Sequence, residues 1–395
     1  MKLSSAKAII CTVLSVSASV YAANVGSPFY GDPPDDHHAW CIHDRNRPQP
    51  AVVTPGTFST LEQPGKPPSD AIVLFDGTDL SKWEADEGNG VPTKWIVKDG
   101  AMECVPKSGY IRTKDTLGDV QLHIEWAAPA KVQGDSQGRG NSGVFLMGLV
   151  EVQVLDNYNN PTYPDGFAGS VYSVNPPMAN ALQPPGQFQV YDIVFRRPIY
   201  KDGKQLDPGY LTVFENGVLV QDHTMLEGGT GHMGRSKPGP FPDAGPLKLQ
   251  DHGNPVRFRN VWYRPLPRRA IEGGTDGYLT TEAATAKRAE IAAKLRQDAE
   301  KLKNESNPVP EILGLAESLV YENNSDASER LGQLAAQWWG EIQQLPADKL
   351  AAKKDEIKHM RDVAKYLVRA KVIPEDAEEF TTINDFVKEH NWDKK

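Results

Sequence analysis

Hydrophobic and polar residues alternate along residues 150–155 with a period of two, as they do in a half-buried β-strand. Val150, Val152 and Val154 then point to one face, which we expect to be buried. Glu151 and Gln153 share the opposite face. Asp156 follows five residues after Glu151, so a regular strand turns it away from Glu151 unless a bulge intervenes.

Short strand-like runs of this kind fill the first two thirds of the chain. Asp-Gly and Asn-Gly pairs supply the turns between them, and Asn216-Gly217 is a hairpin signal between two apolar runs. Such an arrangement predicts an antiparallel β-sandwich. The expected strands are residues 71–75, 95–97, 120–126, 143–147, 150–155, 190–195, 210–215 and 256–263.

Beyond residue 281 the pattern changes to a helical period. Only 4 of the 31 prolines and 3 of the 34 glycines lie there, so the turn signals nearly stop. Apolar residues recur at spacings of three and four in 292–302, 331–345 and 357–367, which predicts amphipathic helices packed as a bundle. Of the adjacent Trp338 and Trp339, we expect at least one in the core of this bundle.

These changes of pattern predict five segments. The first, residues 1–22, is similar to a secretory signal peptide, with Lys2 and Lys7 around the start of an apolar stretch and a small-residue cleavage site at its end. The proline-rich residues 23–70 are expected to form an extended arm. A β-sandwich is expected at 71–267, a linker at 268–281 and an α-helical bundle at 282–395.

The signal-like segment predicts a secreted or periplasmic protein. It is too short to cross a bilayer comfortably, and no later run approaches the roughly 20 apolar residues that a membrane helix requires. We therefore expect no membrane span. In an oxidising compartment, a disulfide between Cys41 and Cys104 is one alternative for these two residues.

The net charge of −9 argues against nucleic acid as a partner and is compatible with a small neutral carbohydrate. No HExxH or paired CxxC motif is present, which disfavours the zincin class. Residues 35–38 form an Asp-Asp-His-His cluster, but no second cluster at a metal-site spacing accompanies it. The metal ligands are therefore unknown. A divalent cation as cofactor and a protein partner for the helical segment both stay open.

Glu151, Gln153 and Asp156 form a Glu-x-Gln-x-x-Asp pattern that resembles the Glu-x-Asp-x-x-Glu strand of laminarinase-like retaining glucanases. In those enzymes two carboxylates flank the sugar bond, one as nucleophile and one as acid. Here the middle position is an amide and the last is a shorter carboxylate. An ordinary retaining glucanase requires a second carboxylate about 5 to 5.5 Å from Glu151. The other interpretation is a strand whose polar face simply meets water.

Six segments together resemble the 3-keto-disaccharide hydrolase family, once known only as a domain of unknown function. The resemblance covers about residues 70–265. One position departs from the family pattern, since Met147 stands where many members have an arginine that would clamp the substrate. The six segments are residues 74–83, 141–145, 151–156, 169–172, 216–220 and 249–262.

The resemblance implies a concanavalin A-like jelly-roll sandwich that cleaves 3-keto-glycosides. A ketone at C3 of a glucosyl unit acidifies the C2 proton, so a base can remove it, the glycosidic oxygen can leave from C1, and water can then add. Glu151 and His252 are the candidate catalytic residues, as base, acid or proton shuttle. The candidate substrate-binding residues are Asn141, Gln153, Asp156, Tyr158, Gln250 and Arg257.

Two of these candidates come from the segment 249–262. Alternation places Gln250 and His252 on one face and Asp251 on the other, so Asp251 is not assumed to form a dyad with His252. Arg257 and Arg259 have two interpretations: a partner for Glu151, or an exterior face. For Arg259 we favour a structural role.

Aromatic residues near the candidate strand can stack on sugars, although aromatic residues in strands are more often core. Tyr158 is the preferred platform ahead of Trp126, Tyr172 and Trp262, and His232 is expected at the rim of the site. A second class of function stays open beside the enzyme. In that alternative, the sandwich is a carbohydrate-binding module without catalysis and the helical segment is its partner domain.

Overall fold

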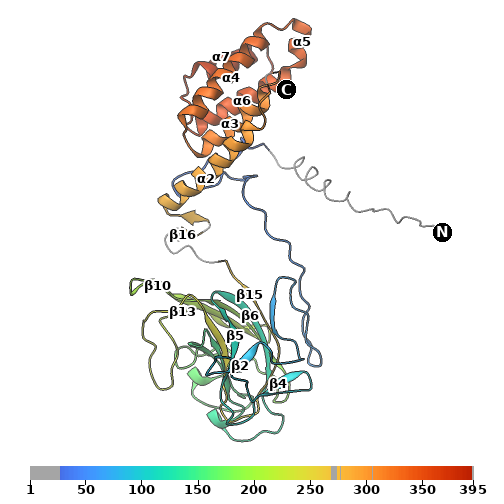
Figure 1. Ribbon diagram of the computed structural model, residues 1–395, viewed down its shortest axis with the longest axis vertical. Coiled ribbons are helices and arrows are strands. Elements are labelled where there is room, and N and C mark those ends of the chain that lie inside the picture. The colour runs from blue at the N-terminus through green and yellow to red at the C-terminus, as the bar shows by residue number, and fades with distance from the viewer. Residues whose placement is uncertain (1–26, 268–273, 276, 305, 394–395) are drawn as a thin grey trace, which may run out of the picture. The chain divides into compact units, whose positions relative to one another are not determined.

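The computed structural model describes residues 27–267, 274–275, 277–304 and 306–393 of the chain. It divides into two compact units, one formed by residues 1–50 with 272–395 and the other by residues 51–271. The first is mainly helical and the second mainly β (Figure 1). The predicted class, a β-sandwich followed by helices, is confirmed. The predicted signal peptide lies outside the described residues.

The larger sheet of the sandwich has eight antiparallel strands. Seven run in the order β13-β12-β9-β6-β15-β4-β3, and β1 also pairs with β15. The strands are β1 (Ile72–Phe75), β3 (Ile96–Lys98), β4 (Ala101–Glu103), β6 (Val120–Ala127), β9 (Gln189–Arg196), β12 (Gly209–Glu215), β13 (Val218–Leu226) and β15 (Arg257–Pro265).

The second sheet has five strands in the order β2-β5-β14-β7-β8. They are β2 (Trp83–Ala85), β5 (Ile111–Leu117), β7 (Ser142–Leu146), β8 (Val150–Val154) and β14 (Gly245–Leu249). Short 3-10 turns form at η1 (Ser136–Gly138) and η2 (Pro164–Gly166). Two hairpins stand apart from both sheets, β10 (Ile199–Lys201) with β11 (Lys204–Asp207) and β16 (Gly274–Thr275) with β17 (Tyr278–Leu279).

One apolar core lies between the two sheets. Val150, Val152 and Val154 are fully buried in it together with residues of the larger sheet such as Ile124 and Ile193. Each buried aliphatic side chain of this size contributes roughly 1.5 to 3 kcal/mol. This burial fixes the side of β8 that faces the core, so the residues between the valines must point outward.

All eight strands expected from the alternation are present, each within two residues of its expected bounds. Strands β2, β4, β5 and β14 were not predicted. In β5 the alternation is obscured because Thr113 and Asp115 occupy positions on the side of apolar Ile111 and Leu117. The Thr113 hydroxyl is satisfied there by the backbone carbonyl of Asp115 at 2.6 Å, which allows it to be buried.

The predicted N-terminal arm is divided between the two units. Residues 27–50 belong to the helical unit and residues 51–70 to the sandwich. Arg45 of the first part forms an ion pair with the buried Glu317 of the helical unit. The arm is therefore not one continuous wrapping, because its first part is anchored by a buried charge.

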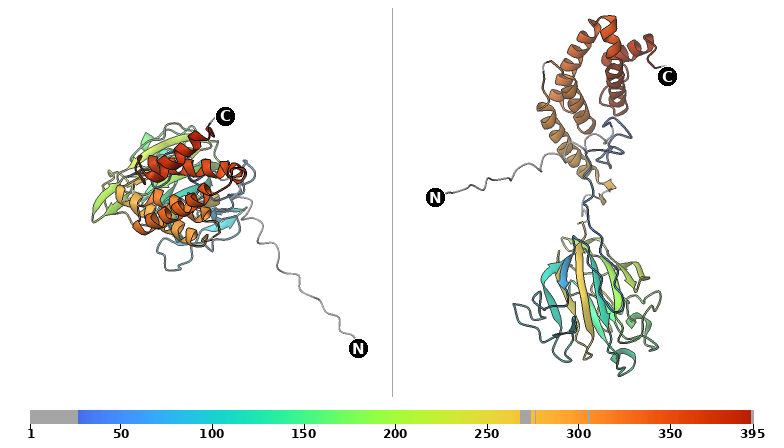
Figure 2. Two further views of the ribbon diagram at one scale, coloured as in Figure 1. Left: turned by 90° about the horizontal axis from the view of Figure 1, so that it is seen from above. Right: turned by 90° about the vertical axis from the view of Figure 1, so that its right-hand side faces the viewer.

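The helical unit confirms the three predicted runs and adds helices to them (Figure 2). Trp338 is buried in its core, and Trp339 packs against that core. No helix in the described part of the chain is long and apolar enough to cross a membrane. The helices are α2 (Thr281–Glu300), α3 (Val309–Tyr321), α4 (Ser325–Gln343), α5 (Ala347–Ala352), α6 (Lys354–Arg369) and α7 (Glu378–Glu389).

Cys41 and Cys104 are free, buried thiols. Cys41 belongs to the helical unit and Cys104 to the sandwich. The disulfide considered from the sequence is therefore absent from this structure. Burial raises the pKa of both thiols, which leaves them in the unreactive protonated form.

Candidate functional site

Polar side chains cover the outward side of the five-stranded sheet, which we call the polar face. The strand register sets them in two rows across the sheet. Each row begins on residues 169–172, which pair with the outer edge of β8. The first row is Tyr172, Glu151, Phe145, Lys248, Arg112 and Glu84, and the second is Ser170, Gln153, Gly143, Gln250, Tyr110 and Asp86.

Glu151 is a buried carboxyl group on this face. It is only 5% exposed, and its carboxyl group makes no hydrogen bond or ion pair with any residue that the structure describes. A Cβ atom on Gly143 would lie 2.3 Å from Glu151 Oε1, so the glycine provides the space for the carboxyl group. Burial raises the pKa of Glu151 to about 8. A group with such a pKa can exchange a proton near neutral pH.

Two cations that the sequence did not single out lie in the same row. Lys248 Nζ forms an ion pair with Asp86 at 2.7 Å, and Arg112 Nε forms one with Glu84 at 2.9 Å. Only Phe145 separates Lys248 from Glu151 in the row. The signal that would have revealed Lys248 is the alternation of β14, a strand that we did not predict.

The amides of Asn141 and Gln153 meet at a third amide, Gln137. Asn141 Nδ2 donates to the backbone carbonyl of Gln137 at 2.7 Å, and Gln153 Nε2 donates to Gln137 Oε1 at 3.1 Å. Gln137 Nε2 in turn donates to the backbone carbonyl of Gly166 at 3.0 Å. The structure therefore brings Asn141 and Gln153 together through Gln137, a residue in η1 that the sequence did not indicate.

Gln250 keeps an open hydrogen-bonding position on the polar face. Its Nε2 donates to the Tyr110 hydroxyl at 2.7 Å. Its Oε1 is buried and has no hydrogen-bond partner among the described residues. A buried acceptor without a partner is costly, so this oxygen is suited to a hydroxyl group of a ligand.

Three side chains form a hydrogen-bonded chain beside Glu151. Tyr172 is the cross-strand neighbour of Glu151, and its backbone N–H donates to the Glu151 carbonyl at 3.2 Å. The Tyr172 hydroxyl lies 2.9 Å from the Tyr163 hydroxyl and 3.0 Å from His232 Nδ1. His232 is thus at the exposed end of this chain, which agrees with its predicted place at the rim.

Comparison with known proteins identifies the sandwich. Residues 70–264 match the family described as a 3-keto-alpha-glucoside-1,2-lyase-like domain. The crystal structure of a candidate glycosyl hydrolase from Parabacteroides distasonis is 44% identical, with a TM-score of 0.54, and the match covers 57% of this chain and 95% of that one. The chain belongs to this family.

Two further relatives are more distant. The 3-keto-disaccharide hydrolase of Bacteroides thetaiotaomicron is 24% identical over 246 residues, which are 49% of this chain and 78% of that protein. A second candidate glycosyl hydrolase of Parabacteroides distasonis is 23% identical, with a TM-score of 0.34, over 50% of this chain and 94% of that one. The lyase-like family membership makes the protein an enzyme that cleaves glycosidic bonds.

Met147, where the sequence departs from the pattern of this family, lies in the tight turn between β7 and β8. Met147, Gly148 and Leu149 connect the paired residues Leu146 and Val150. Met147 and Gly148 have positive φ, at 53° and 68°, and the Leu149 backbone N–H donates to the Leu146 carbonyl at 3.0 Å. The Met147 side chain is buried in the core between the sheets. Of the two cations in the first row, Lys248 is the nearer to Glu151. Gly148 leaves room for it, since a Cβ there would lie 2.6 Å from Lys248 Cε.

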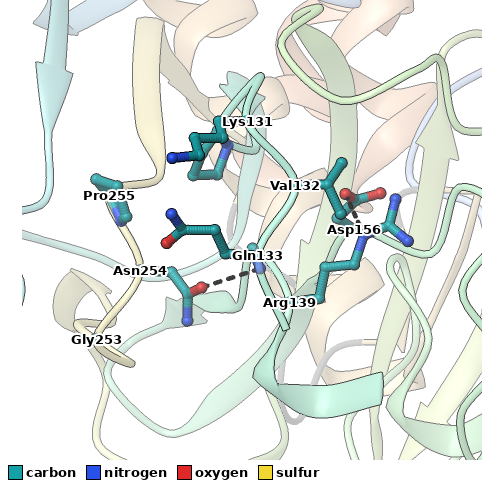
Figure 3. Close-up of a pocket in the computed structure, with 10 residues that line it drawn as sticks. Lys131, Val132, Gln133, Arg139, Asp156, Gly253, Asn254 and Pro255 are labelled. Atoms are coloured by element: carbon teal, nitrogen blue, oxygen red, sulfur yellow. Dashed lines mark hydrogen bonds and ion pairs between the residues drawn. The ribbon is translucent and has the colours of Figure 1, made fainter. Parts of the chain in front are cut away.

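Asp156 does not share the polar face with Glu151. It lies beyond the end of β8, where Arg139 Nε donates to Asp156 Oδ2 at 2.7 Å (Figure 3). Both residues line a pocket of about 180 Å³ together with Lys131 and Asn254. Glu151 is not among the residues that line this pocket.

Tyr158, the preferred stacking platform, is 37% exposed and lies two residues after Asp156. Its backbone N–H donates to Asp156 Oδ1 at 3.2 Å, and its carbonyl accepts from Arg139 Nη2 at 3.0 Å. The backbone of Tyr158 is thus bonded to two residues that line the pocket. The other aromatic candidates differ, since Trp126 is in the core and Trp262 stacks on His123 on the larger sheet.

His252 is exposed in the turn that follows β14. The strand ends at Leu249, so the alternation that we extended to His252 does not apply there. Asp251 serves the turn itself, accepting from Gly253 N at 2.8 Å and from Gly109 N at 2.9 Å. The structure therefore keeps Gln250 on the polar face but does not place His252 in either row.

Arg257 lies on the larger sheet and is not a partner of Glu151. Its Nε is 3.8 Å from Glu103 Oε2, and its Nη2 donates to the Lys98 carbonyl at 3.2 Å. Arg259, for which we favoured structure, is buried and donates to Glu125 at 2.7 Å. Neither arginine is therefore a partner of Glu151. Both lie on the outward face of the larger sheet, which was the second interpretation.

The acidic and histidine residues at 35–38 have structural contacts. The Asp35 carboxylate accepts from the backbone N–H groups of His37 and His38 at 2.8 Å each. The His37 ring stacks on Tyr278 with centroids 4.3 Å apart. Among the residues that the structure describes, no group of three or more His, Cys, Asp or Glu side chains is placed to hold a metal ion.

Proposed function

We propose that this enzyme cleaves 3-keto-disaccharides and related 3-keto-glycosides by elimination followed by hydration. Glu151 removes the proton from C2, and the electron pair of that bond forms a C1–C2 double bond as the glycosidic oxygen leaves C1. Water then adds across the double bond. The family membership supports the substrate class, and the hydrolase from Bacteroides thetaiotaomicron carries the same substrate in its name.

The state of Glu151 carries this proposal. A carboxylate that is paired in an ion bridge is a weak base, whereas Glu151 is buried with a pKa raised to about 8. Such a carboxylate holds a proton strongly once it has taken it. Removal of a proton next to a ketone needs a base matched to neutral pH, and the polar face supplies one.

The distances between carboxyl groups argue against an ordinary retaining glucanase. The other acids of the two rows, Glu84 and Asp86, come from β2, four strands away from β8. At about 4.8 Å per strand they lie roughly 19 Å away, compared with about 5 to 5.5 Å in retaining enzymes. Asp156 is separated from Glu151 by three residues of strand, about 10 Å, and then by Leu155.

The remaining polar groups suit the other atoms of the substrate. Gln250 Oε1 accepts a sugar hydroxyl, and the Asn141 and Gln153 amides line the same face. Lys248 supplies positive charge for the C3 ketone oxygen, on which negative charge develops as C2 loses its proton. Its charge is partly neutralised by Asp86, so we assign it a smaller effect than Glu151.

The test compares a 3-keto-disaccharide with its unoxidised parent sugar. Sugar release is followed with the wild-type chain, Glu151→Gln and Glu103→Gln, a control on the opposite sheet beside Arg257. We expect release from the keto substrate alone, lost in Glu151→Gln and kept in Glu103→Gln. The same series after metal depletion shows whether a divalent cation takes part.

Each other outcome has a defined meaning. Equal release from both sugars indicates a glucanase and contradicts the elimination mechanism. Binding without release from either sugar indicates a carbohydrate-binding module. Full activity in Glu151→Gln assigns the base to another residue.

We also propose that the protein is exported and that residues 1–22 are removed. The support is the charged start, apolar stretch and small-residue end of this segment. Mass spectrometry of the protein from periplasmic and secreted fractions tests this, with Ala23 expected as the first residue. An intact N-terminus in the cytoplasmic fraction contradicts it.

A further inference from the structure

Elimination from a disaccharide leaves one problem that Glu151 does not solve. A sugar alkoxide is a poor leaving group, so the glycosidic oxygen needs a proton as its bond to C1 breaks. Glu151 receives the C2 proton in the same step. The acid must therefore be a second group beside Glu151.

The hydrogen-bonded chain of His232, Tyr172 and Tyr163 is placed for this task. Tyr172 stands directly across from Glu151 on the polar face. Tyr163, at the end of the chain opposite His232, packs against Gly166, where a Cβ would lie 2.1 Å from its ring and 2.8 Å from Gln137 Nε2. Gln137 is the amide that holds Asn141 and Gln153, so the Tyr163 ring borders the candidate substrate site.

The exposed fractions of the three side chains suit a proton path with open ends and a shielded middle. His232 is exposed to solvent, Tyr172 is 8% exposed, and Tyr163 is 42% exposed. The middle member is thus shielded from water, while both ends are open. Tyr172 has one hydroxyl hydrogen, and each of its two neighbours lies at about 3 Å, so it can accept from one and donate to the other.

We propose that Tyr163 is the general acid of this reaction and that Tyr172 and His232 are positioning residues that return its proton. This inference rests on the proposed function. The Tyr163 O–H bond breaks and its proton bonds to the leaving oxygen, which takes the electron pair of the C1–O bond. Tyr172 donates to Tyr163, His232 donates to Tyr172, and His232 regains a proton from water.

Burial and the hydrogen bond with Tyr172 raise the pKa of Tyr163, and the negative charge of Glu151 contributes. Tyr163 therefore keeps its proton until a strongly basic oxygen appears. A departing sugar alkoxide is such an oxygen, whereas an ordinary water molecule is not. The chain thus delivers a proton when the C1–O bond breaks and not before.

The experiment varies the leaving group. The full-length protein and its Tyr163→Phe, Tyr172→Phe and His232→Gln variants are assayed on a 3-keto-disaccharide and on the 3-keto-glucoside of 4-nitrophenol. Nitrophenolate leaves without a proton, so it does not need the acid. A merely structural role for these residues would lower both rates equally.

We expect Tyr163→Phe to lose about 100-fold or more on the disaccharide and less than about fivefold on the nitrophenyl glycoside. Tyr172→Phe should show the same split, and His232→Gln a smaller one because water can reach the end of the chain. The matched controls are Tyr210→Phe and His223→Gln. These residues form a stacked Tyr–His pair on the larger sheet, with centroids 4.0 Å apart, and should leave both rates unchanged.

Two results overturn the proposal while leaving the proposed function intact. Equal loss on the two substrates means that Tyr163 only supports the fold, and no loss on either means that another group protonates the leaving oxygen. A wild-type protein that cleaves neither keto substrate refutes the proposed function itself, and the acid assignment falls with it. Thermal unfolding of each variant identifies any that is misfolded. For such a variant, the ratio of its rates on the disaccharide and the nitrophenyl glycoside decides the role of the residue, because the loss of folded protein lowers both rates equally.

Discussion

Glu125 and Glu151 are both buried glutamates on outward faces of the sandwich, yet their surroundings are opposite. Glu125, on β6 of the larger sheet, is fully buried and receives hydrogen bonds from Ser59, Asn260 and Arg259 at 2.6 to 2.7 Å. Glu151, on β8, has no such partner among the described residues. Burial alone would raise both pKa values.

For Glu125 the partners outweigh burial. Burial would raise its pKa, but the hydrogen bonds from His123, Ser59, Asn260 and Arg259 together lower it. Burial likewise opposes the charge on His123, and its contacts with Asp192 and Glu125 raise its pKa to about 9. This cluster is an ion network that fixes residues 51–70 to the sheet.

The comparison teaches that burial of a carboxyl group does not by itself indicate function. A buried carboxylate whose bonds are satisfied stabilises the fold and cannot accept a proton easily. A buried carboxyl group without hydrogen-bond or ion-pair partners weakens the fold and is available for chemistry. Variants at Glu151, Glu125 and Lys248 test this distinction.

The first prediction concerns catalysis by Glu151. Glu151→Gln should lower kcat on the 3-keto-disaccharide by about 10³-fold, because a positioned base contributes roughly 10² to 10⁴. Initial rates of sugar release measure it, with Glu103→Gln as the control. A loss below tenfold would show that an open buried carboxyl group is not the base.

The second prediction concerns the stability that Glu125 provides. Glu125→Gln should lower the free energy of unfolding by about 3 to 5 kcal/mol, because it leaves buried Arg259 without its charged partner. Urea denaturation of the full chain measures the change. Glu103→Gln removes a half-exposed partner of Arg257 and should cost less than about 1 kcal/mol. Equal costs for the two variants would contradict the assigned roles.

The third prediction concerns pH. The pKa of Glu151 in the folded protein is raised to about 8 from its ordinary 4.5. Between these pH values Glu151 is ionised in the unfolded chain but still protonated in the folded protein. The unfolded state is therefore favoured, and the wild type loses stability as pH rises. The penalty is absent below about 4.5 and complete above about 8. Glu151→Gln lacks it, so the variant should be the more stable protein at pH 8, by a few kcal/mol at about 1.4 kcal/mol per unit.

Urea denaturation at pH 4.5, 6 and 8 provides the measurement. The advantage of Glu151→Gln should grow steadily with pH and be close to zero at pH 4.5. In the wild type, kcat/KM should rise with pH and level off near pH 8, where the base becomes ionised. A stability difference that is constant with pH would mean that Glu151 has an ordinary pKa.

The fourth prediction concerns the charge near the site. Lys248→Met should lower kcat about tenfold, a smaller loss than removal of an unscreened oxyanion donor, because Asp86 already balances much of the lysine charge. Lys349→Met in α5 of the helical unit is a matched control. A rate unchanged by Lys248→Met would remove this cation from the mechanism.

Much of the sandwich could be predicted because the core leaves a local signal. The alternation of Val150, Val152 and Val154 gave both the strand and its outward residue Glu151. By contrast β5 and β14 were missed, because Thr113 and Asp115 interrupt the apolar positions of β5 and β14 is only five residues long. The site residues on these strands, Arg112 and Lys248, were missed with them.

The candidate site shows the same division. Glu151, Gln153, Asn141 and Gln250 could be predicted because they alternate with apolar residues in strands or immediately beside them. His252 could not be placed, since the strand ends three residues before it and alternation has no meaning in a turn. Gln137, Tyr163 and Lys248 reach the site from parts of the chain that no local pattern connects to β8.

The sequence by itself determined the class of the fold, the family of the sandwich and the outward position of Glu151. These depend on periodicity and on short motifs, which are properties of neighbouring residues. The tertiary structure alone decided which buried glutamate is satisfied and which is open. That difference depends on partners such as Ser59 and Arg259, 66 and 134 residues away from Glu125, and on Gly143, whose missing side chain leaves the space that Glu151 fills.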